Sequence, residues 1–201
     1  MLTPYPRSYW VMPGRLLAGY YPGAPDPVEA AGKLQVLFDV GIRCIVNLME
    51  PDERDHRHGG LFADYSGIFA EIAAEQQEAV SCLRFPVPDL QVPDIDTMHR
   101  ILDAIDAATE AGRPVYVHCW SGIGRTGTAV GCCLIRRGLA APETVVETIR
   151  RLREGVDAQW SRPSPETRAQ IDFVRSWPRH EKFSGDDFSA RAVTQYVSGG
   201  W

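Results

Sequence analysis

The stretch that decides the fold is VYVHCWSGIGRTG at residues 115–127, which runs directly into the apolar segment TAVGCCLI at residues 128–135. A β-branched run, a glycine-bearing loop and an apolar helical pattern follow one another, and this order predicts a strand, a tight turn and a helix N-terminus. Gly122 and Gly124 allow the loop backbone to turn its N–H groups inward. A helix that begins at Arg125 adds the partial positive charge of its N-terminus. The stretch therefore predicts an anion-binding cradle.

Cys119 lies at the mouth of this cradle, six positions before Arg125. The field that binds an anion also favours a thiolate over a thiol, so we expect Cys119 to be a charged nucleophile. Arg125 offers a planar fork to two oxygens of one anion, and Thr126 can donate its hydroxyl to the sulfur. Each feature alone is compatible with a buried strand cysteine or a glycine turn. Together they predict a catalytic cysteine.

The pattern His-Cys-x-x-Gly-x-Gly-Arg-Thr-Gly at residues 118–127 resembles the signature of the cysteine-dependent protein tyrosine phosphatases, especially the dual-specificity class. The resemblance implies hydrolysis of a phosphomonoester through a cysteinyl-phosphate intermediate, with no metal and no cofactor. It implies that His118 orders the loop by hydrogen bonds and helps to stabilise the thiolate. Rhodanese-like sulfurtransferases also place a cysteine below backbone N–H groups, but their loop is one residue shorter. The phosphate-binding residues implied by the resemblance are Trp120, Ser121, Gly122, Ile123, Gly124 and Arg125.

A second segment, PVPDLQVP at residues 86–93, resembles the general-acid loop of this class. The departing alkoxide or phenoxide must be protonated in the first step, and water must be activated in the second. Asp89 is the expected acid and base, although an aspartate between prolines can also be only a turn residue. Asp94 and Asp96 are expected in the first turn of the next helix, where carboxylates complement the helix dipole.

The segment SPETRAQIDF at residues 164–173 resembles the closing helix of the class, in which a glutamine can lie under the phosphate loop. Gln170 is the candidate for that position, although a polar residue on a helix is more often only solvated. We expect Ser164 to be the N-cap of this helix and Pro165 its first residue.

The charged segment EPDERDHRHGG at residues 50–60 follows a predicted buried strand. Loops at the carboxyl ends of parallel strands lie at the ligand edge of a sheet, so this loop is a candidate substrate-recognition element. His56 and His58 could bind a metal, but two histidines among arginines on a loop are more often solvated.

Apolar strands alternate with helices along the chain, which predicts an α/β fold with a mostly parallel central sheet flanked by helices. The resemblance implies the single-domain fold of the phosphotyrosine protein phosphatases, with the phosphate-binding loop between the last strand and a helix. We expect one domain over residues 1–182 and a C-terminal tail over 183–201. The predicted strands are 15–18, 43–49, 81–87 and 115–118, and the predicted helices are 27–40, 61–79, 97–111, 125–137, 142–153 and 164–177.

Composition limits the remaining possibilities. At 201 residues with 44% hydrophobic residues, the chain is long enough for one substantial domain. The net charge of −5 disfavours a nucleic-acid or anionic-membrane partner, and no apolar run approaches the ~20 residues of a membrane span. Five cysteines without framework spacing predict a reducing, cytoplasmic location. We expect a monomer.

The loop also bears on the substrate. Trp120, Ser121 and Ile123 are uncharged, whereas relatives that act on multiply phosphorylated inositol lipids tend to place lysines at these positions. Phosphotyrosine, phosphoserine or phosphothreonine in a protein is therefore the preferred substrate. A small phosphorylated metabolite or an inositol phosphate is the alternative. A catalytically silent phosphate-binding module is the alternative of another class, and the presence of Cys119, Arg125 and Asp89 together disfavours it.

Overall fold

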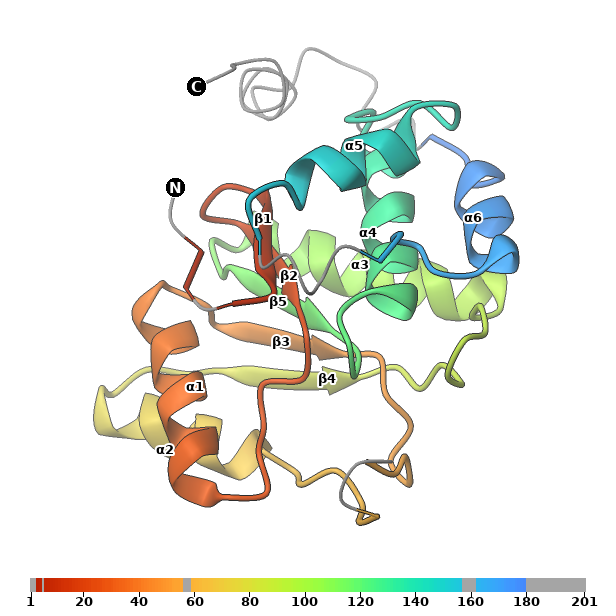
Figure 1. Ribbon diagram of the computed structural model, residues 1–201. Coiled ribbons are helices and arrows are strands. Elements are labelled where there is room, and N and C mark those ends of the chain that lie inside the picture. Colours follow the sequence, from red (N-terminus) through yellow and green to blue (C-terminus); the bar gives the residue numbers. More distant parts are fainter. Residues whose placement is uncertain (1–2, 5, 56–58, 157–161, 180–201) are drawn as a thin grey trace.

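A mixed five-stranded sheet in the order β1-β2-β5-β3-β4 forms the centre of the molecule (Figure 1). β1 pairs antiparallel with β2, and the other neighbouring strands are parallel. The predicted α/β fold with a mostly parallel sheet is confirmed. The strands are β1 (Ser8–Met12), β2 (Leu16–Gly19), β3 (Cys44–Asn47), β4 (Ser81–Arg84) and β5 (Val115–His118).

Helices cover both faces of this sheet in the computed structural model, which describes residues 3–4, 6–55, 59–156 and 162–179. α1 (Pro27–Asp39) and α2 (Ser66–Glu75) lie on one face (Figure 1). The other face carries α3 (Ile95–Glu110), α4 (Gly124–Arg136), α5 (Val145–Leu152) and α6 (Arg168–Arg175). Every residue of β2, β3 and β5 is buried, which explains why these strands are almost continuously apolar in sequence.

Three predictions fall on residues outside the described ranges: the C-terminal tail at 183–201, and the solvated state of His56 and of His58. Within the described ranges, no helix combines the length and the apolar character that a bilayer span requires.

β1 was not predicted as a strand. The first strand was expected only at residues 15–18, because prolines interrupt the strand pattern on both sides of β1. The structure instead pairs Tyr9 with Ala18 and Trp10 with Leu17 in an antiparallel edge ladder. All five residues of β1 are buried, so burial of the Tyr9 and Trp10 rings stabilises a strand that the prolines obscure.

Two helices are shorter than their sequence patterns predicted. α2 begins at Ser66 instead of residue 61, because Leu61 forms an antiparallel bridge with Arg54 and the Asp64 carboxylate accepts a hydrogen bond from the Ser66 N–H at 2.9 Å. α5 begins at Val145 instead of residue 142. Helix-forming residues alone therefore did not locate these N-termini.

The N-terminus of α6 also differs from the prediction. Thr167, not Ser164, is the N-cap, and it forms a capping box with Gln170. Ser164 instead donates its hydroxyl to the carbonyl oxygen of Ile123 at 2.8 Å, and Pro165 lies before the helix. The segment before α6 is thus hydrogen-bonded, through Ser164, to the loop that precedes α4.

α4 packs very closely against this segment and against α6. A Cβ atom at Gly127 would lie 2.2 Å from the Ser164 hydroxyl, and one at Gly131 would lie 2.5 Å from a methyl carbon of Val174. Glycine at both positions lets the two helices approach, which fixes the N-terminus of α4 relative to α6.

Candidate active site

The predicted loop lies at the carboxyl end of β5, between the parallel neighbours β2 and β3, where ligands bind in open α/β sheets. Cys119 follows β5 directly and is buried, with 2% of its surface exposed. β5 therefore delivers the cysteine to the central position of the ligand edge, and α4 begins five residues later at Gly124.

Gly122 is required by the shape of this loop. Its φ angle is +73°, and a Cβ atom there would lie 2.5 Å from the backbone carbon and oxygen of Gly19. The Tyr21 N–H donates to the carbonyl oxygen of Trp120 at 3.0 Å, which joins the loop to the segment after β2. No residue with a side chain fits at position 122 without a shift of backbone, so the glycine holds the curvature of the cradle.

The N-terminus of α4 supplies the positive side of the cradle. Its N-cap is Ile123, which has no side-chain oxygen to cap the helix. The first-turn N–H groups of a helix have no partner within the helix, and they carry its partial positive charge. Such an uncapped N-terminus, next to a tightly curved loop, is suited to an anion of the size of phosphate.

Arg125 is held in place by a carboxylate that the sequence analysis did not single out. Its Nη1 lies 2.6 Å from Oε2 of Glu53 and its Nη2 lies 2.8 Å from Oε1, while Nη1 also donates to the Val87 carbonyl at 3.0 Å. The arginine side chain is 1% exposed. Burial alone would lower the pKa of Arg125, but Glu53, Cys119 and Asp89 outweigh burial and raise it. The guanidinium is therefore a fixed, permanently charged group.

This arrangement leaves one edge of the guanidinium for a ligand. Glu53 occupies the edge between Nη1 and Nη2, whereas Nε of Arg125 is buried and has no hydrogen-bond partner in the described part of the chain. A buried donor is costly unless it is hydrogen-bonded, so Nε is suited to bind an acceptor that enters the cradle. The edge formed by Nε and Nη2 matches two oxygens of a phosphoryl group.

Asp89 lies at this same edge. Its Oδ1 is 3.0 Å from Nη2 of Arg125, and its side chain is 47% exposed. The carboxylate thus occupies the place at Nη2 that a phosphate oxygen would take. A bound phosphoryl group would displace Asp89 from the guanidinium while keeping it beside the ligand, where a leaving oxygen could be protonated.

Gln170 lies against the start of α4 and holds the segment that carries Asp89. A Cβ atom at Gly124 would lie 3.1 Å from the Gln170 amide, so the side chain is packed beneath the cradle. Its Nε2 donates to the carbonyl oxygen of Gln91 at 3.1 Å, and its Oε1 accepts from the Thr167 N–H at 3.1 Å. The Thr167 hydroxyl also reaches the Leu90 carbonyl at 3.5 Å. α6 therefore braces the acid loop.

His118 is buried and neutral. Burial is the main cause that lowers its pKa to about 3, and Arg84 and Arg125 lower it further. A neutral ring has one N–H, and because Nδ1 lies 3.0 Å from the Cys119 carbonyl oxygen, that N–H is on Nδ1. Nε2 then accepts a hydrogen bond from the Tyr65 hydroxyl at 2.5 Å. His118 orders the loop backbone and adds no positive charge beside Cys119.

The remaining predicted residues are placed as follows. The Thr126 hydroxyl is buried without a hydrogen-bond partner among the described residues, so the predicted bond to the Cys119 sulfur is not formed here. Asp94 caps α3 and accepts from the Thr97 N–H at 2.6 Å, which holds the pKa of Asp94 below its usual value. Asp96 lies in the first turn of α3, as expected. No group of three metal-binding side chains occurs within the described ranges.

Two residues of the site, Glu53 and Tyr65, were not predicted from the sequence. Glu53 comes from the charged loop after β3, which was expected only at the rim. Because β3 is the parallel neighbour of β5, the strand order could have indicated that this loop reaches the cysteine loop, but not which carboxylate turns inward. Tyr65 immediately precedes α2, and no pattern in its surroundings points to His118.

Comparison with known proteins agrees with this geometry. A family described as "Polymorphic toxin system, DSP-PTPase phosphatase" matches residues 22–139. The crystal structure of Tk-PTP in its active form has a TM-score of 0.64 at 20% identity, covering 85% of this chain and 95% of that chain. The crystal structure of PTPMT1 has a TM-score of 0.61 at 20% identity, covering 85% and 92%.

These findings define the class: the chain has the fold of the protein tyrosine phosphatase-like structures and matches a dual-specificity phosphatase family model over more than half of its length. Within it, the chain belongs to the DSP-PTPase phosphatase family of polymorphic toxin systems. Among curated proteins, the mouse (Mus musculus) protein tyrosine phosphatase domain-containing protein 1 is 28% identical over 198 residues, 94% of this chain. The chain spans 25% of that relative's length.

The Glu53–Arg125 pair yields a first prediction. Glu53→Gln keeps the side-chain shape but replaces one acceptor oxygen by an amide that faces the guanidinium. We expect kcat/KM for an activated aryl phosphate to fall roughly 10- to 100-fold, because the arginine loses its fixed orientation. Asp52→Asn removes the same charge from an exposed position of the same loop and should change kcat/KM less than twofold. Equal kinetics in the two variants would show that Glu53 does not position Arg125.

Buried His118 yields a prediction for stability against pH. In the unfolded chain a histidine titrates near pH 6.5, whereas in the folded protein the His118 pKa is about 3. Between these values the unfolded state binds the extra proton, so the free energy of unfolding falls as pH falls. From pH 6.5 to pH 5 the loss due to His118 is about 1.5 kcal/mol. Urea titrations should show this extra loss in the wild type relative to His118→Gln. Parallel pH curves would contradict a neutral buried ring.

Proposed function

We propose that the protein hydrolyses phosphorylated side chains of proteins, phosphotyrosine, phosphoserine or phosphothreonine, through a cysteinyl-phosphate intermediate. The observation that carries the chemistry is the edge of Arg125 formed by Nε and Nη2, in the cradle that contains Cys119. Nε has no hydrogen-bond partner among the described residues, and Nη2 is paired with the exposed carboxylate of Asp89. A tetrahedral oxyanion satisfies that edge and the uncapped N–H groups of α4 at once.

In the first step, the Cys119 thiolate attacks phosphorus and the bond from phosphorus to the ester oxygen breaks. Arg125 and the loop N–H groups hold the non-bridging oxygens, whose charge is balanced by donors already in place. The phosphoryl group displaces Asp89 from Nη2. Away from the guanidinium, the Asp89 carboxylate takes up a proton from solvent, and this proton passes to the departing oxygen as the ester bond breaks.

In the second step, water attacks the cysteinyl phosphate and the bond from sulfur to phosphorus breaks. Asp89, now a carboxylate, accepts a proton from the water. The Thr126 hydroxyl, which has no partner among the described residues, is available to donate to the departing thiolate. Phosphate then leaves, and the site returns to its starting state.

Two features support a protein substrate. The loop positions Trp120, Ser121 and Ile123 carry no charge that would select a multiply phosphorylated small molecule. The relative that aligns over 94% of this chain is named a protein tyrosine phosphatase domain-containing protein. Structural neighbours include TpbA of P. aeruginosa in complex with pTyr and PTPMT1 in complex with PI(5)P, so an inositol phosphate is the alternative to test.

A substrate panel tests the proposed class. Phosphotyrosine, phosphoserine and phosphothreonine peptides should give a higher kcat/KM than inositol phosphates or sugar phosphates. Cys119→Ser should abolish turnover of every substrate, because a serine hydroxyl is not ionised at neutral pH, and it thereby controls for contaminating phosphatases. An inositol phosphate hydrolysed with the highest kcat/KM would replace the protein substrate by the alternative.

The role of Asp89 is tested by the leaving group. Asp89→Asn should lower kcat/KM for phenyl phosphate by about 10²–10⁴, because phenoxide leaves poorly without a proton. The loss should be far smaller for a nitrophenyl phosphate, whose anion leaves unaided. Asp94→Asn is the matched control: asparagine also serves as an N-cap, so this variant should keep the helix cap and leave the ratio of the two substrates unchanged. If Asp94→Asn changes that ratio and Asp89→Asn does not, the acid has been assigned to the wrong aspartate.

A further inference from the structure

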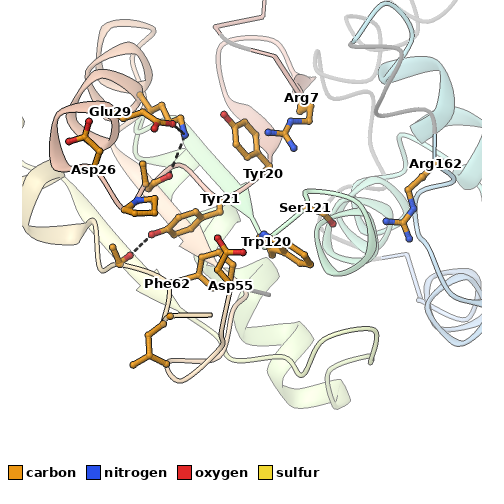
Figure 2. Close-up of a pocket in the computed structure, with 17 residues that line it drawn as sticks. Arg7, Tyr20, Tyr21, Asp26, Glu29, Asp55, Phe62, Trp120, Ser121 and Arg162 are labelled. Atoms are coloured by element: carbon orange, nitrogen blue, oxygen red, sulfur yellow. Dashed lines mark hydrogen bonds and ion pairs between the residues drawn. The ribbon is translucent and has the colours of Figure 1, made fainter. Parts of the chain in front are cut away.

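A cavity of about 720 Å³ opens beside the phosphate-binding loop (Figure 2). Trp120 and Ser121, the two residues that follow Cys119, form the wall nearest the loop. The opposite walls come from the segment after β2, from α1, and from Asp55 and residues 60–63. Its volume lies within the 300–1,000 Å³ of sites that enclose small ligands, so it has room for a side chain and its flanking peptide groups.

Aromatic rings dominate the part of the cavity next to the loop. Tyr20, Tyr21, Phe62 and Trp120 line it, and Figure 2 shows them gathered between the loop and α1. The Tyr21 and Phe62 rings meet edge to face at 4.9 Å, and the Phe62 and Trp120 rings are tilted at 6.1 Å. The Tyr21 hydroxyl donates to the Ala63 carbonyl at 2.5 Å, which fixes the wall. Tilted rings of this kind accept a further aromatic ring.

The charges around the cavity balance. Lys33 is paired with Glu29 at 2.7 Å, Arg162 is paired with Glu166, and the Arg7 guanidinium lies 4.0 Å from the centre of the Tyr20 ring. The cavity therefore has no net positive field to bind a second phosphate, and an uncharged group suits it better. The charged residues that line it are three cations and three carboxylates: Arg7, Lys33, Arg162, Asp26, Glu29 and Asp55.

We infer that this cavity binds an aromatic side chain of the substrate protein, one or two residues from the phosphorylated residue. The inference rests on the proposed function, and it narrows the substrate class to phosphorylated sites flanked by Tyr, Phe or Trp. Because the cavity begins one residue from Cys119, a phosphate in the cradle places the neighbouring peptide residues beside it. Consecutive Cα atoms are about 3.8 Å apart, so one or two residues reach the ring cluster.

The test compares phosphotyrosine peptides that each carry one substitution. The substituted position lies within two residues of the phosphotyrosine, on either side. At one of these positions, Phe, Tyr or Trp should raise kcat/KM roughly tenfold or more over Ala, the range for filling an apolar pocket. Nucleoside monophosphates form a separate arm, since a base could also stack on these rings. The measured quantity is the ratio of kcat/KM for the aromatic peptide to kcat/KM for the Ala peptide. Both values come from the same enzyme preparation, so partial unfolding of a variant lowers both and leaves their ratio unchanged.

Phe62→Ala and Leu61→Ala remove parts of the cavity wall and should reduce this ratio toward one. Ile95→Ala is the matched control for Leu61→Ala, because Ile95 is 54% exposed and Leu61 is 58% exposed, and Ile95 does not line the cavity. Peptides hydrolysed with ratios within twofold at every position would overturn the inference and leave the proposed function intact. A preference that survives both wall variants would also overturn it. Nucleoside monophosphates hydrolysed faster than all peptides would overturn both.

Discussion

The paired contact between Glu53 and Arg125 is the interaction on which the geometry of the site depends. The carboxylate occupies one edge of a buried guanidinium, with 2.6 and 2.8 Å separations, and the Val87 carbonyl occupies a further position on Nη1. Burying an arginine is costly unless its donors are satisfied, so these contacts determine which donors remain. The donors that remain are Nε, which has no partner in the described part of the chain, and Nη2, which Asp89 shares. The ligand, the acid and the supporting carboxylate are thus arranged around a single planar group.

The rest of the fold brings these groups together from distant parts of the sequence. β5 supplies Cys119 and the loop after its parallel neighbour β3 supplies Glu53. The loop after β4 supplies Asp89, and α6 braces that loop through the Gln170 amide. Close packing of α4 against α6 depends on glycine at position 131 of α4, since a Cβ atom there would lie 2.5 Å from a methyl carbon of Val174. The same packing sets the start of α4, and therefore the direction of its uncapped N–H groups.

Local patterns predicted the parts of the site that lie within one segment of sequence. The sequence predicted the cysteine loop, the α/β alternation and the carboxylates at the start of α3. These features are determined locally, because glycine permits the turn, apolar residues mark the buried strands and aspartate caps the helix. Glu53 and Tyr65 were not predicted, because their partners are 72 and 53 residues away. Thr167 replaced Ser164 as the cap of α6 because the Ser164 hydroxyl bonds to the Ile123 carbonyl, a tertiary contact that outweighs the local preference. β1 was not predicted because prolines flank it in the sequence, and burial of the Tyr9 and Trp10 rings stabilises it as a strand.

In the proposed mechanism, Cys119 carries the phosphoryl group between the two steps. This role can be tested by acid-quenching the Asp89→Asn variant during turnover of a nitrophenyl phosphate and locating the phosphoryl group by peptide mass spectrometry. The activated ester forms the intermediate without an acid, whereas its hydrolysis lacks the base, so phosphorylated enzyme should accumulate. We expect one phosphoryl group on the peptide that contains Cys119, and none in Cys119→Ser treated in the same way. A phosphoryl group on another residue, or wild-type turnover that never leaves one on Cys119 under rapid quenching, would contradict it.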